Sequence, residues 1–303
     1  MRAVFFGPRQ RQRQRQRQRQ RQRLRQRLRL QAAAAAAATA AAAAASGGQW
    51  VNPCQGGSMA ANASEETLAN DYDTFGEAYA IETEHSLINA YYTRPAILDL
   101  VGDVAGRKIL DAGCGAGPLS ASLRDRGARV SGFDFSATMV ELARKRLGED
   151  ADLRVADISQ PLPYADQQFD DVVAALVLHY LEDWTAPLAE LRRIIRPGGR
   201  LILAVNHPLL YKFVHPEGNY FAVERWSEEY TFNGQQGVLA YWHRPLHAMT
   251  DDFTRAGFRV SVISEPYPAA GAQEKFPEEM QGKEAFLCFL FFVLEVPEAP
   301  EAA

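Results

Sequence analysis

The chain has 303 residues, of which 47% are hydrophobic and 23% charged, and its formal net charge is −4. This composition is ample for a buried core, and the length allows one large domain or two small ones. The charge is unevenly divided, because 12 of the 33 basic residues lie in positions 1–30, which hold no acid, and positions 31–64 hold no charge. From Glu65 onward, the remaining 21 basic residues face 37 acidic ones, a balance of −16. So acidic a region is poorly suited to bind nucleic acid or anionic lipid.

The first 58 residues are of low complexity. Arg and Gln alternate over 9–23, and 32–45 is alanine with one threonine. Such compositions build no core, so we interpret 1–58 as a disordered tail. Three origins stay open: an over-extended translation with Met59 as the true start, an RNA-binding arm, or an organelle transit peptide. No segment is long and apolar enough to be predicted as a membrane span.

The cysteines predict neither a zinc site nor a disulfide framework. Cys54, Cys114 and Cys288 lie far apart, and none forms a C-x-x-C pair. Histidine and carboxylate residues also show no metal-ligand spacing, so we expect no metal. Reduced thiols fit a cytoplasmic location best; organelle import is the alternative if 1–58 is a genuine transit segment.

The strongest functional signal is the stretch Lys108–Pro118, which reads KILDAGCGAGP. A buried strand is followed by a tight turn with glycines at positions 113, 115 and 117, and a proline suits the first turn of the next helix. A strand, a glycine turn and a helix N-terminus together form a site for a nucleotide-like ligand. The next predicted strand ends at Asp134, where a carboxylate can accept hydrogen bonds from ribose hydroxyls.

The exact spacing narrows the ligand. The glycines follow G-x-G-x-G, whereas the dinucleotide fingerprint is G-x-G-x-x-G, and Pro118 stands where the third glycine would fall. Asp111 lies just before the glycines, at the tip of the first strand. An acid there would repel a pyrophosphate but suits a cationic amine, such as the methionine half of S-adenosylmethionine.

Strands and helices alternate through most of the chain, which predicts right-handed βαβ units and a parallel sheet. The RPGG stretch at 196–199 predicts a helix stop and a turn before the fifth strand. The final apolar run, 286–294, suits the interior of a sheet. The predicted strands are 108–112, 129–133, 152–155, 170–175, 199–205, 259–264 and 286–294, and the predicted helices between them are 119–126, 137–147, 184–195 and a helix ended by Gly257.

Two segments flank this alternation. Residues 64–101 read as helices, with Tyr72, Phe75 and Tyr79 spaced to share one face. Residues 206–245 break the rhythm and contain nine aromatic residues. An insertion of this length is usually functional or disordered, and its aromatic content argues against disorder. We expect an irregular segment that closes over a substrate.

Four stretches carry a family resemblance: LDAGCGAGPLS, GFDFSATMVELAR, ADISQPLPYADQQFDDVVAALVLHYLEDW and LRRIIRPGGRLILAV. In order and spacing they resemble the motifs of class I S-adenosylmethionine-dependent methyltransferases, most of all the small-molecule branch that includes the quinone-biosynthesis enzymes. The resemblance covers about 97–294. It implies an α/β fold with a Rossmann-like, seven-stranded, mostly parallel sheet, helices on both faces, and a helical N-terminal lid. It also places the antiparallel last strand between the fifth and sixth.

The resemblance implies one methyltransferase domain over 65–295, with a substrate cap at 206–245 and a disordered tail at 296–303. The implied reaction is transfer of a methyl group from S-adenosylmethionine to O, N or C of a small aromatic or apolar acceptor. Within the motifs, Asp111 would reach the cofactor amine, Asp134 the ribose, and Asp157 the adenine amino group. The residues implied in cofactor binding are Asp111, Gly113, Gly115, Gly117, Asp134, Phe135, Met139, Asp157, Ile158 and Leu176.

The acceptor site is less clearly marked. The aromatic residues Tyr72, Tyr79, Tyr211 and Trp242 are candidates for binding the substrate, although plain packing is an equally good interpretation. A base could remove the acceptor's proton, and histidine is the usual choice near neutral pH. His207 and His179 follow predicted strands at the carboxyl edge of the sheet. The insertion and its border add His215 and His243 as weaker candidates, and all four could instead be structural.

Some functions are disfavoured. The Asn/Asp-Pro-Pro-aromatic tetrad of DNA amino methyltransferases is missing after the fourth strand, where Leu176–Tyr180 stands instead. Two other functions stay open: a cofactor-binding protein without catalysis, and a nicotinamide-dependent oxidoreductase, against which Asp111 and Pro118 argue. The acceptor, the methylated atom and the oligomeric state are not determined by the sequence.

Overall fold

The computed structural model describes residues 69–298, so the tail at 1–58 and the end of the chain at 299–303 lie outside the described residues. Within 69–298, no helix has the length and apolar character that a bilayer span requires. The chain remains packed on the sheet as far as Val296, whose amide donates to the carbonyl of Gly199 at 2.9 Å. This is one residue beyond the expected end of the domain.

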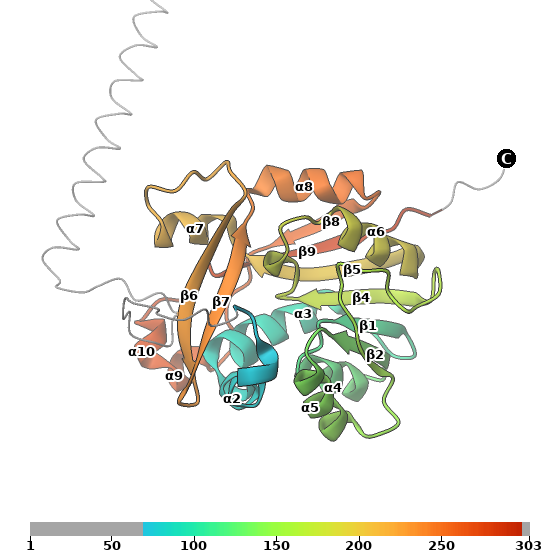
Figure 1. Cartoon of the computed structure of the whole chain (residues 1–303), viewed down its shortest axis with the longest axis horizontal. Helices are drawn as coiled ribbons and strands as arrows, with labels where there is room; N and C mark the ends of the chain where they lie inside the picture. Colours follow the sequence, from blue (N-terminus) through green and yellow to red (C-terminus); the bar gives the residue numbers. More distant parts are fainter. Residues whose placement is uncertain (1–68, 299–303) are drawn as a thin grey trace, which may run out of the picture. The chain divides into compact units, whose positions relative to one another are not determined.

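A seven-stranded sheet forms the centre of the described part (Figure 1). Its strand order is β3-β2-β1-β4-β5-β9-β8, and β9 runs antiparallel to both of its neighbours. The predicted fold class is therefore confirmed, including the position of the last strand inside the sheet. The strands are β1 (Lys108–Ala112), β2 (Arg129–Asp134), β3 (Leu153–Val155), β4 (Phe169–Ala175), β5 (Ile195–Asn206), β8 (Arg259–Ser264) and β9 (Phe289–Glu295).

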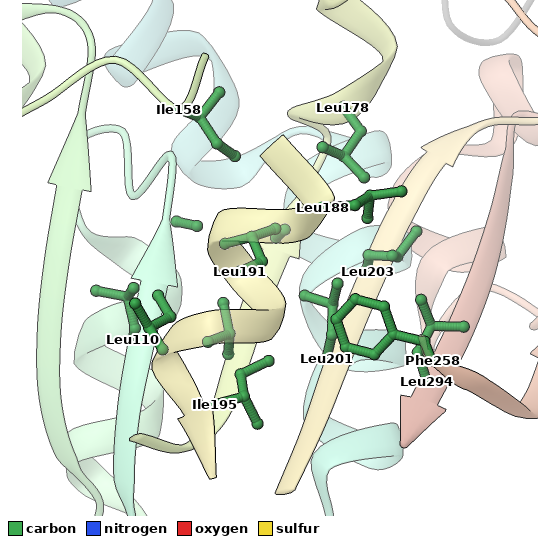
Figure 2. Packing of buried hydrophobic residues seen from close by; sticks show 14 of the residues in the cluster. Leu110, Ile158, Leu178, Leu188, Leu191, Ile195, Leu201, Leu203, Phe258 and Leu294 are labelled. Atoms are coloured by element: carbon green, nitrogen blue, oxygen red, sulfur yellow. The ribbon is translucent and has the colours of Figure 1, made fainter. Parts of the chain in front are cut away.

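Helices cover both faces of the sheet because successive strand residues point to opposite sides. Leu110, Leu201 and Leu203 pack with α6 (Thr185–Ile194) and α8 (Leu246–Arg255). Figure 2 shows part of this cluster, with Leu188 and Leu191 of α6 among the strand residues. The neighbouring residues Ile109 and Ile202 pack on the other face with α3 (Arg94–Val101) and α4 (Pro118–Asp125).

Two details differ from the sequence-based expectations. The RPGG stretch does not separate α6 from the fifth strand, because β5 begins at Ile195 and continues through it with a register shift opposite Phe169 and Asp171. Gly198 takes a φ of +75°, which a glycine adopts without strain.

In addition, Cys288 is disulfide-bonded, whereas Cys114 is free. The expectation of reduced thiols is therefore wrong for Cys288.

The aromatic insertion is regular, contrary to the expectation of an irregular segment. It contains α7 (Pro208–Val214) and an antiparallel hairpin of β6 (Glu224–Phe232) and β7 (Gln235–His243). The two-residue turn between the strands is Asn233-Gly234, and both residues have positive φ values, 44° and 83°. This geometry matches the twist of a hairpin and favours Asn-Gly. In Figure 1 the hairpin stands beside the sheet rather than within it.

The hairpin packs against the first described helix, α2 (Tyr72–His85). The rings of Phe75 and Phe232 stack with centroids 5.5 Å apart, and Gly237 lets the hairpin backbone approach Phe75 closely. Asn70 makes three hydrogen bonds with β7: its amide donates to the carbonyl of Val238, its side-chain nitrogen donates to the carbonyl of Ala240, and its side-chain oxygen accepts from the amide of Ala240. The helix and the hairpin therefore form one packed unit over the carboxyl edge of the sheet.

The remaining helical segments complete this end of the described part. The π-helical segment η1 (Leu87–Thr93) joins α2 to α3, and α5 (Ala137–Leu147) packs beside β3. Leu87 of η1 lies in a small apolar cluster with residues of α9 (Ala272–Lys275) and α10 (Pro277–Met280). A short 3-10 helix, η2 (Leu178–Tyr180), follows β4.

Candidate functional site

A cavity of about 430 Å³ lies at the carboxyl ends of β1, β2 and β4, beneath α2. This is the edge at which open parallel sheets bind their ligands. Nine of the ten residues predicted to bind a cofactor line it, namely Asp111, Gly113, Gly115, Asp134, Phe135, Met139, Asp157, Ile158 and Leu176. The tenth, Gly117, caps the N-terminus of α4 in a left-handed conformation and contacts α5 through Ala143.

The glycine turn has a backbone that a side chain would disturb. Gly113 has a φ of +72°, and a Cβ added there would lie 2.4 Å from Cγ2 of Val177. The amides of Gly113 and Cys114 both donate to the carbonyl of Phe133, at 2.8 and 2.9 Å. The turn is thus hydrogen-bonded to β2 on one side and lies close to Val177, after β4, on the other.

Asp134 is held by two backbone amides. One carboxylate oxygen accepts from Gly115 at 2.9 Å and the other from Ser136 at 3.0 Å. Burial raises the pKa of Asp134, although these hydrogen bonds counteract the effect. Each carboxylate oxygen retains lone-pair capacity for a ligand hydroxyl. Ser136 is the N-cap of α5, because its side chain accepts from the amide of Met139. Asp134 is therefore not needed as the N-cap of this helix.

Asp111 is buried in β1 and accepts a hydrogen bond from the hydroxyl of Ser120 at 2.6 Å. Burial raises the pKa of Asp111 to about 6, because a carboxylate loses its hydration there. The group therefore changes charge close to physiological pH. A ligand cation at this end of the cavity would favour its ionised form.

The other predicted cofactor residues sit on the loops after β2, β3 and β4. Asp157 accepts from the amide of Ser159 at 2.8 Å, and Ile158 is buried beside it. Phe135 is exposed, which is unusual for a large apolar side chain and fits a surface for stacking a ring. Leu176 has a φ of +63°, a strained value for a branched side chain, and its amide is fixed to Ala204 at 2.9 Å.

Neither of the two histidines proposed as bases lines the cavity. His207 begins α7, where Nδ1 accepts from the amide of Leu209 at 3.1 Å and Nε2 lies 2.8 Å from Glu265. His179 is buried, its Nδ1 accepts from the amide of Asn206 at 3.0 Å, and burial lowers its pKa to about 3. Both rings thus hold backbone in place. Their assignment as bases stays a prediction that the geometry does not support.

The four aromatic candidates divide into two pairs. Tyr72 and Tyr79 line the cavity from α2. Tyr211 and Trp242 lie outside its lining; Tyr211 donates to Glu224 and stacks on His243 at 4.3 Å. His243 in turn contacts the carbonyl of Tyr220 at 2.8 Å. This second group consolidates the insertion itself.

Comparison with known proteins assigns the arrangement to a family. Residues 110–203 match a family described as a methyltransferase domain. This part of the chain is a methyltransferase domain. About two thirds of the chain is similar in structure to an S-adenosylmethionine-dependent methyltransferase from Mesorhizobium loti, with a TM-score of 0.52 and 22% identity over 66% of this chain and 95% of that one. That likeness confirms the fold.

Two curated relatives share part of the sequence. A demethylmenaquinone methyltransferase of Renibacterium salmoninarum is 35% identical over 121 residues, which is 40% of this chain and 50% of the relative. A malonyl-[acyl-carrier protein] O-methyltransferase of Serratia marcescens is 39% identical over 99 residues, 33% of this chain and 38% of the relative. The chain therefore matches half or less of the length of these relatives.

Two polar residues that line the cavity, Arg94 and Tyr180, have no role among the sequence-based predictions. Arg94, at the start of α3, lines the cavity, and burial lowers its pKa. Its guanidinium makes no hydrogen bond or ion pair within residues 69–298. Tyr180 also lines the cavity, from η2. No spacing signal marks either residue, because each reaches the cavity only when distant elements meet.

Proposed function

We propose that this protein transfers a methyl group from S-adenosylmethionine to a small-molecule acceptor. The observation that carries the proposal is the convergence of Asp111, Asp134 and Asp157 with the glycine turn on one cavity at the carboxyl edge of the sheet. The methyltransferase domain match at 110–203 supports the same activity. The named relatives act by methyl transfer, and their substrates are not carried over to this chain.

The chemistry of the lining fits each part of this cofactor. Asp134 can accept from the ribose hydroxyls, because its two oxygens are oriented by Gly115 and Ser136. A carboxylate can accept from an exocyclic amine, which suits Asp157 to the adenine, and Ile158 and Phe135 supply apolar surface for the ring. Asp111 suits the amino group of the methionine portion.

Arg94 supplies the remaining charge. A half-buried guanidinium that feels the charge of Glu84 but makes no hydrogen bond to it gains from a ligand anion that pairs with it directly. The methionine portion of the cofactor carries one carboxylate, and an arginine can bind a carboxylate through two parallel hydrogen bonds. The cavity thus presents the carboxyl group of Asp111 to the cofactor's ammonium and the cationic guanidinium of Arg94 to its carboxylate.

The protein's contribution to the reaction is alignment. A sulfonium is an excellent leaving group, so the cofactor supplies the reactive methyl, and the enzyme must hold the acceptor in line with it. The strained backbone at Leu176 and the rigid glycine turn fix the walls of the cavity. α2 lines the cavity, and the insertion 206–245, the proposed cap, packs on α2 through its hairpin; closure of the two would exclude water from the reaction.

Two further predictions complete the proposal. The acidic balance of −16 from Glu65 onward argues against nucleic acid as a partner of the folded domain. A cytoplasmic location stays a proposal that rests on the free thiol of Cys114, whereas the disulfide at Cys288 argues against it.

The test is turnover. The full chain is incubated with S-adenosylmethionine and separate pools of phenols, amines and carboxylic acids, and release of S-adenosylhomocysteine is measured. We expect release that depends on one pool and falls at least about tenfold in Asp134→Ala but not in Asp99→Ala, an exposed aspartate on α3. Cofactor binding without release in any pool would favour a non-catalytic protein instead.

A further inference from the structure

Three tyrosine hydroxyls meet in the wall of the cavity. The hydroxyls of Tyr72 and Tyr180 form a hydrogen bond of 2.7 Å, and the ring of Tyr79 lies against that of Tyr72, with centroids 5.0 Å apart. All three side chains line the cavity. Tyr72 and Tyr79 come from α2, whereas Tyr180 follows β4, only a few residues after the strained Leu176. The lid and the sheet edge therefore meet through polar atoms rather than through apolar contact alone.

This network has unused hydrogen-bonding capacity. Each hydroxyl carries one hydrogen and can accept through its oxygen. The one hydrogen bond, between Tyr72 and Tyr180, uses one of the three hydroxyl hydrogens and leaves the other two, as well as free lone pairs, without a protein partner. Within residues 69–298, no further hydrogen bond reaches these three oxygens. The three side chains are partly buried and line the cavity, so water or a ligand that enters it can take up this capacity.

Aromatic packing fixes the positions of the hydroxyls. The ring of Tyr72 lies 5.0 Å from Tyr79 in an edge-to-face arrangement. The ring of Tyr180 stacks on Tyr241 at 5.6 Å and meets His179 edge-on at 4.6 Å. His179 is itself held by the amide of Asn206. These contacts restrict the tyrosine rotamers, so a ligand need not order them.

The electrostatic environment disfavours an anion at this position. Burial raises the pKa of Tyr72, and it raises that of Tyr79 to about 12. The negative charge of Asp134 raises the pKa of Tyr79 and Tyr180 further. The hydroxyls thus remain protonated and neutral. Among the described residues that line the cavity, Arg94 is the only arginine or lysine, and the proposed cofactor already occupies it.

We propose that the hydroxyls of Tyr72, Tyr79 and Tyr180 bind the acceptor and select a neutral or cationic molecule that presents a hydroxyl or an amine over one that presents a carboxylate. The inference rests on the proposed function and names the substrate class of the same site. A hydroxyl or a neutral amine can both accept the free hydrogens and donate to the free lone pairs, and a protonated amine can donate to the lone pairs. A carboxylate can only accept, and it would have to be desolvated beside Asp134 without a cation.

The experiment separates cofactor binding from acceptor binding. The full chain is saturated with S-adenosylhomocysteine, whose affinity is measured first by calorimetry. Three probes with one ring, phenol, benzylamine and benzoate, are then titrated and followed by ligand-observed NMR. We expect phenol or benzylamine to bind at least about tenfold more tightly than benzoate. The comparison between phenol and benzylamine identifies whether the preferred group is a hydroxyl or an amine.

Conservative variants test the hydroxyls themselves. Tyr72→Phe and Tyr180→Phe keep the rings and remove the oxygens. Each should weaken the preferred probe about five- to tenfold, the loss of one hydrogen bond, and leave the affinity for S-adenosylhomocysteine unchanged. Tyr267→Phe, at an exposed tyrosine, is the matched control and should change neither affinity.

The contradicting results are distinct. Equal or tighter binding of benzoate, unchanged probe affinity in both phenylalanine variants, or no binding of any probe to the S-adenosylhomocysteine complex would overturn this inference and leave the proposed cofactor site standing. Failure of the wild-type protein to bind S-adenosylhomocysteine would overturn the proposed function and the inference together.

Discussion

The carboxylate of Asp134 accepts a hydrogen bond of 2.9 Å from the backbone amide of Gly115. The end of β2 is thereby joined to the glycine turn that follows β1. The orientation of the carboxylate is set by the protein before any ligand binds, which lowers the entropic cost of binding one. The turn and the acid therefore act as one unit, and the predictions below concern the groups that surround it.

The glycine at position 113 should be the least replaceable of the turn. Gly113→Ala would place a Cβ 2.4 Å from Val177 at a φ of +72°. Both the contact and the backbone conformation then oppose folding, and we expect a loss of about 2–4 kcal/mol in the free energy of unfolding. Gly106→Ala is the control, because it has a similar φ of +76° but open space around the added carbon. Urea unfolding of both variants measures the difference; equal losses would contradict the steric account.

Ionisation of Asp111 should make stability depend on pH. Its pKa is raised from 3.8 to about 6 by burial, so the folded state holds the proton more tightly than the unfolded state. The stability that this provides is complete below pH 3.8 and is lost as the pH rises through 6. A shift of about two units corresponds to about 3 kcal/mol as an upper order of magnitude. In the absence of ligand, Asp111→Asn should therefore show a flatter dependence of unfolding free energy between pH 4 and 7. Parallel curves for both proteins would contradict this.

Arg94 should recognise the amino-acid part of the cofactor. Arg94→Gln removes the guanidinium, and we expect the affinity for S-adenosylhomocysteine to fall at least about tenfold, as for the loss of a charged hydrogen bond. The affinity for 5′-methylthioadenosine, which lacks the amino-acid portion, should change little. Arg129→Gln, at an exposed arginine of β2, serves as the control. An equal loss for both ligands would show that Arg94 acts on the fold and not on the carboxylate.

The ion pair between Glu84 and Arg146 should control cofactor release. Arg146 binds both carboxylate oxygens of Glu84, at 2.5 and 3.1 Å, and its Nε donates to the carbonyl of Ala116 in the glycine turn at 2.9 Å. The pair thus connects α2 to the wall of the cavity. Glu84→Gln should cost less than about 1 kcal/mol in stability, because the pair is partly exposed.

Dissociation of S-adenosylhomocysteine should nevertheless become about two- to tenfold faster in Glu84→Gln, since the lid loses one attachment. Stopped-flow measurement of the dissociation rate, with Glu82→Gln on the exposed side of the same helix as control, checks this. Unchanged dissociation in Glu84→Gln would mean that α2 does not gate the cavity.

The sheet and most of the cavity could be predicted because their signals are local. Strand periodicity, the glycine spacing before Pro118 and the acid that ends β2 each lie within a short stretch of sequence. The hairpin has a local signal too, because Asn233-Gly234 lies between strands whose burial alternates. The aromatic content of the insertion does not indicate this turn. Turn chemistry there was more informative than composition.

The acceptor end of the cavity could not be predicted, because its residues meet only in three dimensions. Tyr180 reaches the cavity from the segment after β4 and contacts Tyr72 of α2, 108 residues earlier. Arg94 gives no sign in the sequence that it is left without a partner after folding. For His179 and His207 the residue type suggested catalysis, but side-chain direction, which sequence does not reveal, places both against backbone amides.

The most direct test of the account is calorimetric titration of the full chain with S-adenosylmethionine and S-adenosylhomocysteine, beside the variants Asp134→Ala and Asp99→Ala and a titration with NADH. The account predicts a one-to-one complex with both sulfur ligands, an affinity at least about tenfold weaker in Asp134→Ala, unchanged affinity in Asp99→Ala, and no binding of NADH. A folded protein that binds neither sulfur ligand, or that binds NADH instead, would contradict it.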